Sequence, residues 1–375
     1  MSDAVVVGGG VIGLGVAWRA RLAGLSVTLV DPAPGGGASW AAAGMLAPVT
    51  EVHYGEEALL ALNLASAARY PSFVAELEDA TGLDVGYRRC GTLAVAADAD
   101  DRAVLDDLHA FQSRLGLVSE RLLAGECRKL EPFLAPSVRG GLLVDGDHQV
   151  DNRRLSRSLL AACAGAGVDV VAASAAGVIA HADRVVGVEL DVGARVMAAA
   201  VVLAAGCWSA RLTGLAPGVA PPVRPVKGQI LRLRAALDPP FISRNVRGLV
   251  AGSSIYVVPR ADGEIVVGAT VEEQGFDTTV TAGAVHRLLR DACRVLPGIG
   301  ELELVETQAG LRPGSPDNAP IIGAAAVDGL MLATGHYRNG IQLTPVTADA
   351  VAELLATGTA AELVKPFSPR RFGCS

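Results

Sequence analysis

The feature that most constrains the fold is a glycine-rich turn between a short apolar strand and a helix near the N-terminus. Residues 3–7 are rich in valine and predict a buried parallel strand, and residues 11–23 predict a helix. Between them, Gly8-x-Gly10-x-x-Gly13 has the spacing of a dinucleotide-binding turn. Gly8 permits the tight turn, Gly10 lets the backbone approach a pyrophosphate, and Gly13 lets the helix pack closely on the strand. The helix N-terminus then favours phosphate through its free N–H groups and its dipole.

An acidic residue follows at the end of a second predicted strand. Residues 26–30 close a βαβ unit, and Asp31 comes 18 residues after Gly13. There a carboxylate accepts hydrogen bonds from an adenosine ribose, and its charge disfavours a 2′-phosphate. A glycine-rich turn without a ligand is the alternative, but strand, helix, second strand and acid all follow in the required order. The motif does not choose between FAD and NAD.

Composition limits the class of protein and of partner. The chain has 375 residues, more than one core usually serves, which favours two domains. A net charge of −7 lacks the positive field that nucleic acid or an anionic membrane requires. The longest apolar run, residues 196–205, is too short to span a bilayer, and no basic leader precedes the first strand. No C-x-x-C pair or histidine spacing indicates a metal site. We therefore expect a cytoplasmic protein without bound metal.

The chain alternates between α/β stretches and β-rich stretches, so both predicted domains are discontinuous. Long helices are expected at residues 57–81 and 152–166, and β-rich character dominates between residues 223 and 270. The nucleotide-binding domain is assigned residues 1–86, 141–222 and 305–375. The substrate-binding domain is assigned residues 87–140 and 223–304.

Four further segments carry distinctive small-residue motifs. They are SWAAAGML at 39–46, VLAAGCWS at 202–209, GLRPGSPD at 310–317 before PIIG at 320–323, and GHYRNGI at 335–341. Together they resemble the D-amino acid oxidase superfamily, and the last two are most similar to the thiamine-pathway glycine oxidases. The resemblance covers residues 5 to about 355 in matching order.

The resemblance implies the fold and the reaction. It implies an α/β (α+β two-domain) fold, with a Rossmann-like FAD-binding domain and an interleaved antiparallel β-rich substrate domain. Such an enzyme oxidises glycine to an imine, which hydrolyses to glyoxylate and ammonia, while O2 becomes H2O2. In thiazole biosynthesis the imine itself is the useful product, so hand-over to thiazole synthesis machinery is expected. Relatives are often homo-oligomers, so a homo-oligomer is possible by analogy, but the sequence itself does not give the oligomeric state.

The resemblance also implies that FAD is bound without a covalent link. Related monomeric sarcosine oxidases attach their flavin to a cysteine. No cysteine lies in residues 335–344 or beside Arg312.

Three residues are predicted to orient the substrate. Arg312 is expected to clamp its carboxylate, because a guanidinium matches a carboxylate in a planar, bidentate way. A structural ion pair with Asp317 is the alternative. Tyr256 is expected to donate to the same carboxylate, unless it is a core aromatic. The resemblance implies that Arg338 touches substrate and lines the flavin through its backbone, with a solvated arginine as the alternative. No protein base is nominated, and His336 is expected to be scaffolding.

The remaining predicted residues contact the cofactor. Small residues suit close backbone approach, and the N–H groups of residues 339–342 are expected to face the flavin. Ala176 is expected to touch adenine through its backbone. The full set of cofactor residues is Gly8, Gly10, Ile12, Gly13, Asp31, Pro32, Ala38, Ser39, Ala43, Gly44, Met45, Ala176, Gly206, His336, Tyr337, Arg338, Asn339, Gly340, Ile341 and Gln342.

Two other functions remain open from the sequence. One is a sarcosine or D-amino acid oxidase, or a dehydrogenase that passes electrons to a partner, because the motifs do not specify the acceptor. Ser254 stands where some relatives have histidine, and with Val271 it leaves the substrate preference open. The other is a non-catalytic dinucleotide-binding redox sensor. Arg312 together with Tyr256 argues against the sensor, which needs no carboxylate clamp.

Overall fold

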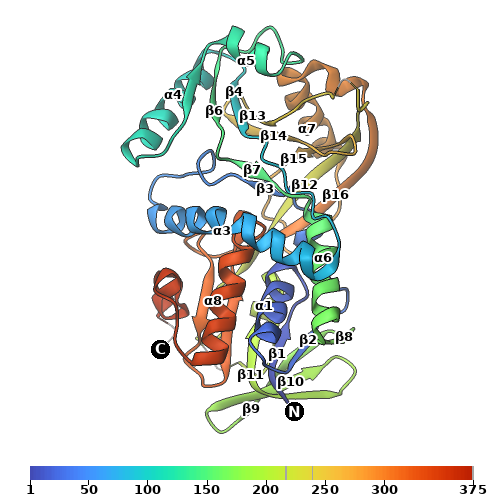
Figure 1. Cartoon of the computed structure of the whole chain (residues 1–375), viewed down its shortest axis with the longest axis vertical. Coiled ribbons are helices and arrows are strands. Elements are labelled where there is room, and N and C mark those ends of the chain that lie inside the picture. The colour runs from blue at the N-terminus through green and yellow to red at the C-terminus, as the bar shows by residue number, and fades with distance from the viewer. Residues whose placement is uncertain (216–217, 239, 374–375) are drawn as a thin grey trace.

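A computed structural model describes residues 1–215, 218–238 and 240–373 and builds them around two large sheets, one in each half of the molecule (Figure 1). The first sheet has the strand order β17-β18-β11-β1-β2-β8. All of its neighbouring strands run parallel except β17. The strands are β1 (Ser2–Val7), β2 (Val27–Val30), β8 (Asp169–Val171), β11 (Arg195–Leu203), β17 (Ile321–Ala324) and β18 (Leu330–Thr334).

Helices cover one face of this sheet and a β-ribbon covers the other. The four helices bury a common apolar core against the sheet, as parallel strands require on both faces. A second core lies under the ribbon. The helices are α1 (Val11–Leu22), α3 (Glu57–Thr81), α6 (Asn152–Ala166) and α8 (Thr344–Thr357), and the ribbon is formed by β9 (Ala175–His181) and β10 (Arg184–Leu190).

The second sheet has the order β16-β12-β15-β14-β13-β4-β6-β5 and is antiparallel except between β13 and β4. One face packs on α7 (Ala282–Val295) to form the core of this half. The other face turns toward the first sheet. The strands are β4 (Thr92–Ala96), β5 (Glu120–Leu122), β6 (Gly141–Val144), β12 (Arg224–Arg234), β13 (Asn245–Val250), β14 (Ser253–Pro259), β15 (Glu264–Gly268) and β16 (Glu303–Gly314).

Shorter elements complete the chain. The two-stranded sheet of β3 (Met45–Leu46) and β7 (His148–Gln149) lies where the chain passes between the halves. The other helices are α2 (Gly37–Trp40), α4 (Ala99–Arg114), α5 (Ala124–Leu130) and the 3-10 turns η1 (Gly206–Arg211), η2 (Pro297–Glu301), η3 (Tyr337–Asn339), η4 (Glu362–Phe367) and η5 (Pro369–Phe372). Within the described ranges no helix combines the length and apolar character that crossing a membrane requires.

The predicted fold class is confirmed, and the predicted helices at 57–81 and 152–166 have the bounds of α3 and α6. The sheet membership of two strands differs from the predicted division at residues 141 and 305. β6 pairs with β4 and β5, and β16 pairs with β12 along nearly its whole length, so both belong to the second sheet. Short apolar strands have the same local pattern in either sheet, and only their pairing partners distinguish them.

Candidate functional site

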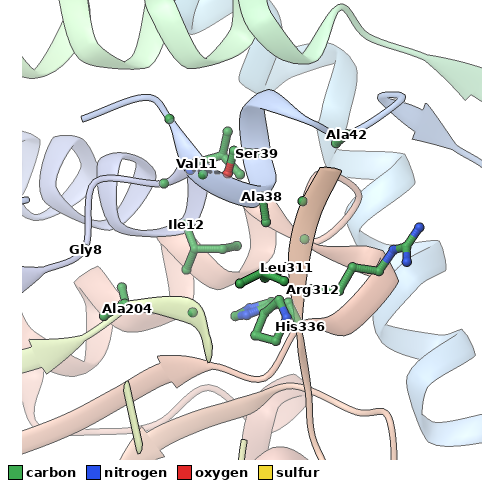
Figure 2. Close-up of a pocket in the computed structure, with 18 of the residues that line it drawn as sticks. Gly8, Val11, Ile12, Ala38, Ser39, Ala42, Ala204, Leu311, Arg312 and His336 are labelled. Carbon is green, nitrogen blue, oxygen red and sulfur yellow. Dashed lines mark hydrogen bonds between the residues drawn. The ribbon is translucent and has the colours of Figure 1, made fainter. Parts of the chain in front are cut away.

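A cavity of about 570 Å³ lies between the two sheets. Its wall combines the carboxyl ends of β1 and β2, the N-terminus of α1, residues 36–45, the outward face of the second sheet, and residues around η1 and η3. Figure 2 shows Gly8, Ile12 and Ala204 on one side of this space and Leu311, Arg312 and His336 on the other. The carboxyl edge of a parallel sheet is where α/β proteins bind nucleotides, and the volume suits a ligand of that size.

The glycine-rich turn forms one end of the cavity. Gly8 has φ +109°, and a β-carbon there would lie 2.4 Å from the carbonyl oxygen of Ala204. A β-carbon on Gly10 would meet only the Ser39 hydroxyl within 4 Å, because its open side faces the cavity. The Ser39 hydroxyl accepts a hydrogen bond of 3.1 Å from the Val11 N–H, marked in Figure 2. Gly13 instead packs against the carbonyl of Gly8, to which a β-carbon would be only 1.8 Å away.

Asp31 ties this turn to the next loop. Its carboxylate accepts hydrogen bonds from the N–H groups of Gly9 at 2.7 Å and Ala33 at 2.7 Å. Asp31 also lines the cavity. A carboxylate has about four acceptor positions, so these two backbone bonds leave capacity for a ribose hydroxyl.

Buried polar groups hold the wall segment at residues 38–45. The side-chain amide of Asn152, at the start of α6, donates to the carbonyls of Ser39 at 2.8 Å and Trp40 at 2.9 Å. Arg260, 6% exposed, donates to the Ala43 backbone carbonyl at 2.7 Å and to the side-chain Oδ1 of Asn152 at 3.1 Å. The segment is thereby fixed against both halves of the molecule.

The register of the second sheet explains how Tyr256 reaches the cavity. Tyr256 on β14 lies directly opposite Gly268 on β15 and Arg247 on β13, so the three share one face. A β-carbon on Gly268 would lie 2.3 Å from the Tyr256 hydroxyl, so the ring rests on that glycine. The hydroxyl makes no hydrogen bond with the described residues, and it is open to the cavity. Burial raises its pKa, which the Arg312 guanidinium partly offsets.

Arg312 is seated on the same face in a similar way. A β-carbon on Gly228 would lie 2.3 to 2.4 Å from three guanidinium atoms, so the guanidinium lies over the bare backbone of β12. It donates to the Thr270 carbonyl at 3.1 Å and to the Lys227 carbonyl at 3.5 Å. Asp317, the alternative partner, pairs instead with Arg371 at 2.8 Å. In the described part of the chain Arg312 forms no ion pair, so it faces the cavity as an uncompensated cation.

Two ion pairs also border this end of the cavity. Arg338 lines the wall and pairs with Glu56 at 2.6 Å, so its charge is balanced and it is not a solvated side chain. Glu51 lines the wall as well and pairs with Arg247. Arg338 and Glu56 are 282 positions apart, and neither acid is marked by a sequence motif.

His336 has the environment of a scaffold residue. It is 2% exposed, and its Nε2 lies 3.1 Å from the Thr347 hydroxyl. Burial lowers its pKa to about 3, so the ring is neutral at physiological pH. It therefore holds no proton to give at neutral pH.

Most predicted residues share this one cavity. Arg312, Tyr256 and Arg338 line it together with Gly8, Gly10, Ile12, Asp31, Pro32, Ala38, Ser39, Ala43, Gly44, Met45, Gly206, His336, Tyr337, Gly340 and Ile341. Six residues named from the sequence lie outside the cavity wall. Four of them are predicted cofactor contacts: Gly13, Ala176, Asn339 and Gln342. The other two are the residues left open for the substrate pocket, Ser254 and Val271.

The exceptions have local causes. The carbonyl of Ala176 accepts from the Thr213 N–H at 3.1 Å, and Ser174 and Ala175 line the wall instead. The Asn339 N–H donates to the His336 carbonyl at 2.8 Å, which corrects its predicted orientation toward the cofactor. The side-chain amide of Gln342 lies outside the cavity wall and donates to the Asn63 carbonyl at 3.0 Å.

Several wall residues were not identified from the sequence. They come from strands or turns whose place depends on pairing in the sheets, and the most polar or bulky of them are Glu51, Trp208, Arg211, Ile230 and Thr334. Gly228, on which Arg312 rests, was also not identified. Only Trp208 falls within a motif that was noted, VLAAGCWS, and its tryptophan was the available signal.

The residues present fit FAD. The Gly10 cradle and the N-terminus of α1 suit a pyrophosphate, and Asp31 suits a ribose. The small residues 41–44 leave room for a flat ring beside the second sheet. None of the described residues that line the cavity is a cysteine.

Comparisons with known proteins agree with this fold and site. A family model described as FAD dependent oxidoreductase (DAO) matches residues 3–354. The crystal structure of glycine oxidase from Geobacillus kaustophilus superposes with a TM-score of 0.91 and 33% identity, covering 99% of this chain and 98% of that one. The chain therefore belongs to the DAO family of FAD-dependent oxidoreductases, as the sequence resemblance predicts.

Curated relatives give the same family. Glycine oxidase from Pseudomonas aeruginosa is 38% identical over 357 residues, which are 94% of this chain and 94% of that protein. The bifunctional protein ThiO/ThiG from Trichormus variabilis is 36% identical over 372 residues, or 99% of this chain. The chain spans 55% of the length of that second relative.

We predict that Gly10→Val separates cofactor binding from folding. Gly10 has φ −72° and ψ 177°, which any residue adopts, and its β-carbon points into the phosphate end of the cavity. The variant should fold, and its FAD content at purification should fall to near zero. The exposed Gly125→Val on α5 is the control and should purify yellow. A yellow Gly10→Val protein would contradict the assignment of this end to the pyrophosphate.

We predict that His336 makes the protein less stable in acid. Its pKa is about 3 when folded and 6.5 when unfolded, so the unfolded chain binds the extra proton below pH 6.5. The free energy of unfolding should fall as pH is lowered, by about 1.4 kcal/mol per pH unit from this group. In urea titrations at saturating FAD, the decrease between pH 7 and pH 5 should be about 2 kcal/mol smaller in His336→Asn. Equal decreases in the two proteins would contradict the neutral, buried ring.

Proposed function

We propose that this protein is an amino acid oxidase that takes a hydride from the α-carbon of a small amino acid, with glycine the leading substrate. The observation that carries the proposal is the uncompensated Arg312 guanidinium beside the free Tyr256 hydroxyl, both facing the cavity. A partly buried cation without a counter-ion is an anion site, and a guanidinium with a phenol suits a carboxylate. The glycine oxidases among the relatives support the choice of glycine.

The proposed reaction is balanced with water and oxygen as co-reactants. FAD, when bound, accepts the hydride and passes the two electrons to O2, which becomes H2O2. The α-carbon–hydrogen bond breaks, and the amine lone pair forms the C=N bond of the imine. Water then hydrolyses the imine to glyoxylate and ammonia.

The residues of this chain orient the substrate and supply the positive charge that binds its carboxylate. Arg312 and Tyr256 hold the carboxylate, which fixes the direction of the α-carbon. Gly228 and Gly268 let these two side chains lie flat on the sheet, and this leaves the space above them for a small substrate. No described histidine or carboxylate is required as a base, because the amine gives its ammonium proton to water before the hydride leaves.

A role in thiamine thiazole biosynthesis extends the proposal. It is supported by the resemblance to thiamine-pathway enzymes and by the relatives named ThiO/ThiG, which are longer than this chain. In such a role the imine is handed to thiazole synthesis machinery. An oxidase or dehydrogenase acting on sarcosine or small D-amino acids is the alternative within the family, and a redox sensor is the alternative outside it.

The experiment that tests this function is a flavin spectrum of the purified protein, followed by peroxide release with glycine, sarcosine, D-alanine and D-proline. We expect a yellow protein and the highest kcat/KM with glycine. Anaerobic bleaching of the flavin without peroxide in air would indicate a dehydrogenase. Absence of bleaching with every amino acid would favour the sensor and refute the proposal.

We predict that Arg312→Ala raises the KM for glycine more than Tyr256→Phe does. Loss of the unpaired cation beside Tyr256 should cost about 2–5 kcal/mol of carboxylate binding, a rise in KM of roughly thirty-fold or more. The hydroxyl contributes one hydrogen bond, so its loss should be smaller. Arg234→Ala, on the same sheet but outside the cavity wall, should leave KM unchanged. The reverse order of the first two variants would overturn these roles.

A further inference from the structure

The substrate end of the cavity has more arginine nearby than one carboxylate needs. Arg312 and Arg338 line the wall, and Arg247 lies directly opposite Tyr256 in the β13–β14 ladder. Arg338 is balanced by Glu56 and Arg247 is balanced by Glu51. Only Arg312 is left to attract an anion, among the described residues at this end.

Glu51 and Arg247 have different relations to the cavity. Glu51 belongs to the wall and Arg247 does not, although their side chains are similarly exposed, at 22% and 18%. The ion pair therefore presents Glu51 to the cavity, whereas its Arg247 partner is not part of the wall. A ligand in the cavity meets a negative charge at this place, and the positive charge lies behind it.

The same pair acts on the position where substrate is expected. Glu51 raises the pKa of the Tyr256 hydroxyl, and Arg247 lowers it, so both lie within electrostatic range of that hydroxyl. Burial limits solvent screening, so a second carboxylate on the substrate would be repelled by the nearer, negative end of this ion pair.

We propose that Glu51, held in place by Arg247, restricts the substrate to amines with a single carboxylate. The inference rests on the proposed function and names its substrate class. Glu51 is a specificity residue, and Arg247 is the positioning residue behind it. Removal of the Glu51 side chain should uncover Arg247 as a second carboxylate clamp, and the site should then accept a dicarboxylate amine.

The test compares glycine, which has one carboxylate, with iminodiacetate, which is glycine with a second carboxylate carried on its nitrogen by a methylene group. We expect Glu51→Ala to raise the ratio of kcat/KM for iminodiacetate to that for glycine on the order of tenfold or more. Glu51→Gln removes the charge but leaves the Arg247 side chain covered, so its increase should be smaller. Glu362→Ala changes net charge equally on the exposed surface, outside the cavity wall, and should leave the ratio unchanged.

The double variant Glu51→Ala/Arg247→Leu identifies the source of the gain. It leaves no lone buried charge, so it should fold even if Glu51→Ala is unstable. The ratio should return toward the wild-type value, because the second clamp is gone. The proposal would be overturned by an unchanged ratio in a FAD-loaded Glu51→Ala protein, or by a gain that persists in the double variant.

A binding measurement decides the question without turnover. Calorimetry of the holoenzyme with acetate and malonate should show acetate binding to wild type, and malonate binding strongly only to Glu51→Ala. If no amino acid is oxidised, the proposed function fails while this selectivity still tests Glu51. Equal malonate affinity in wild type and Glu51→Ala would reject the role of Glu51 even if glycine is oxidised.

Discussion

The site depends on a small buried network that fixes residues 38–45 between the two sheets. Asn152, at the first turn of α6, binds two carbonyls of this segment, and Arg260, at the end of β14, binds a third and also binds Asn152. In the described chain Arg260 has no carboxylate partner, and burial lowers its pKa to about 10. A buried guanidinium that donates only to neutral oxygens is stable when those bonds are kept, so the network resists rearrangement. The cavity wall is therefore set by polar groups as much as by apolar packing.

Glycines shape the cavity in a second way, because they have no side chain at places where the backbone must lie close to a neighbouring group or to the ligand. Gly8 and Gly10 clear the phosphate end, whereas Gly228 and Gly268 clear the places under Arg312 and Tyr256. The two pairs lie on different sheets and in distant parts of the chain, yet they shape one cavity. We infer that this FAD-dependent oxidoreductase needs both halves for one site, with the nucleotide end formed by the first sheet and the substrate end by the second.

Sequence reasoning succeeded where the determinants are local. The βαβ unit and the helices α3 and α6 follow from residue patterns within a single element. Arg312 and Arg338 were found through short motifs, and both line the cavity together with the predicted Tyr256. Local patterns could not assign β6 or β16 to a sheet, because strand pairing is a long-range property. They also could not reveal Glu51 or Glu56, whose importance comes from arginines far away in the chain.

We propose above all that Arg312 is the cation that binds the acid end of the substrate. The most direct measurement is a crystal structure of the FAD-loaded protein with glycolate, an unreactive analogue that keeps the carboxylate of glycine. The account predicts two hydrogen bonds from the Arg312 guanidinium to that carboxylate and one from the Tyr256 hydroxyl. A carboxylate bound elsewhere in the cavity, with the Arg312 side chain turned away from it, would contradict the account.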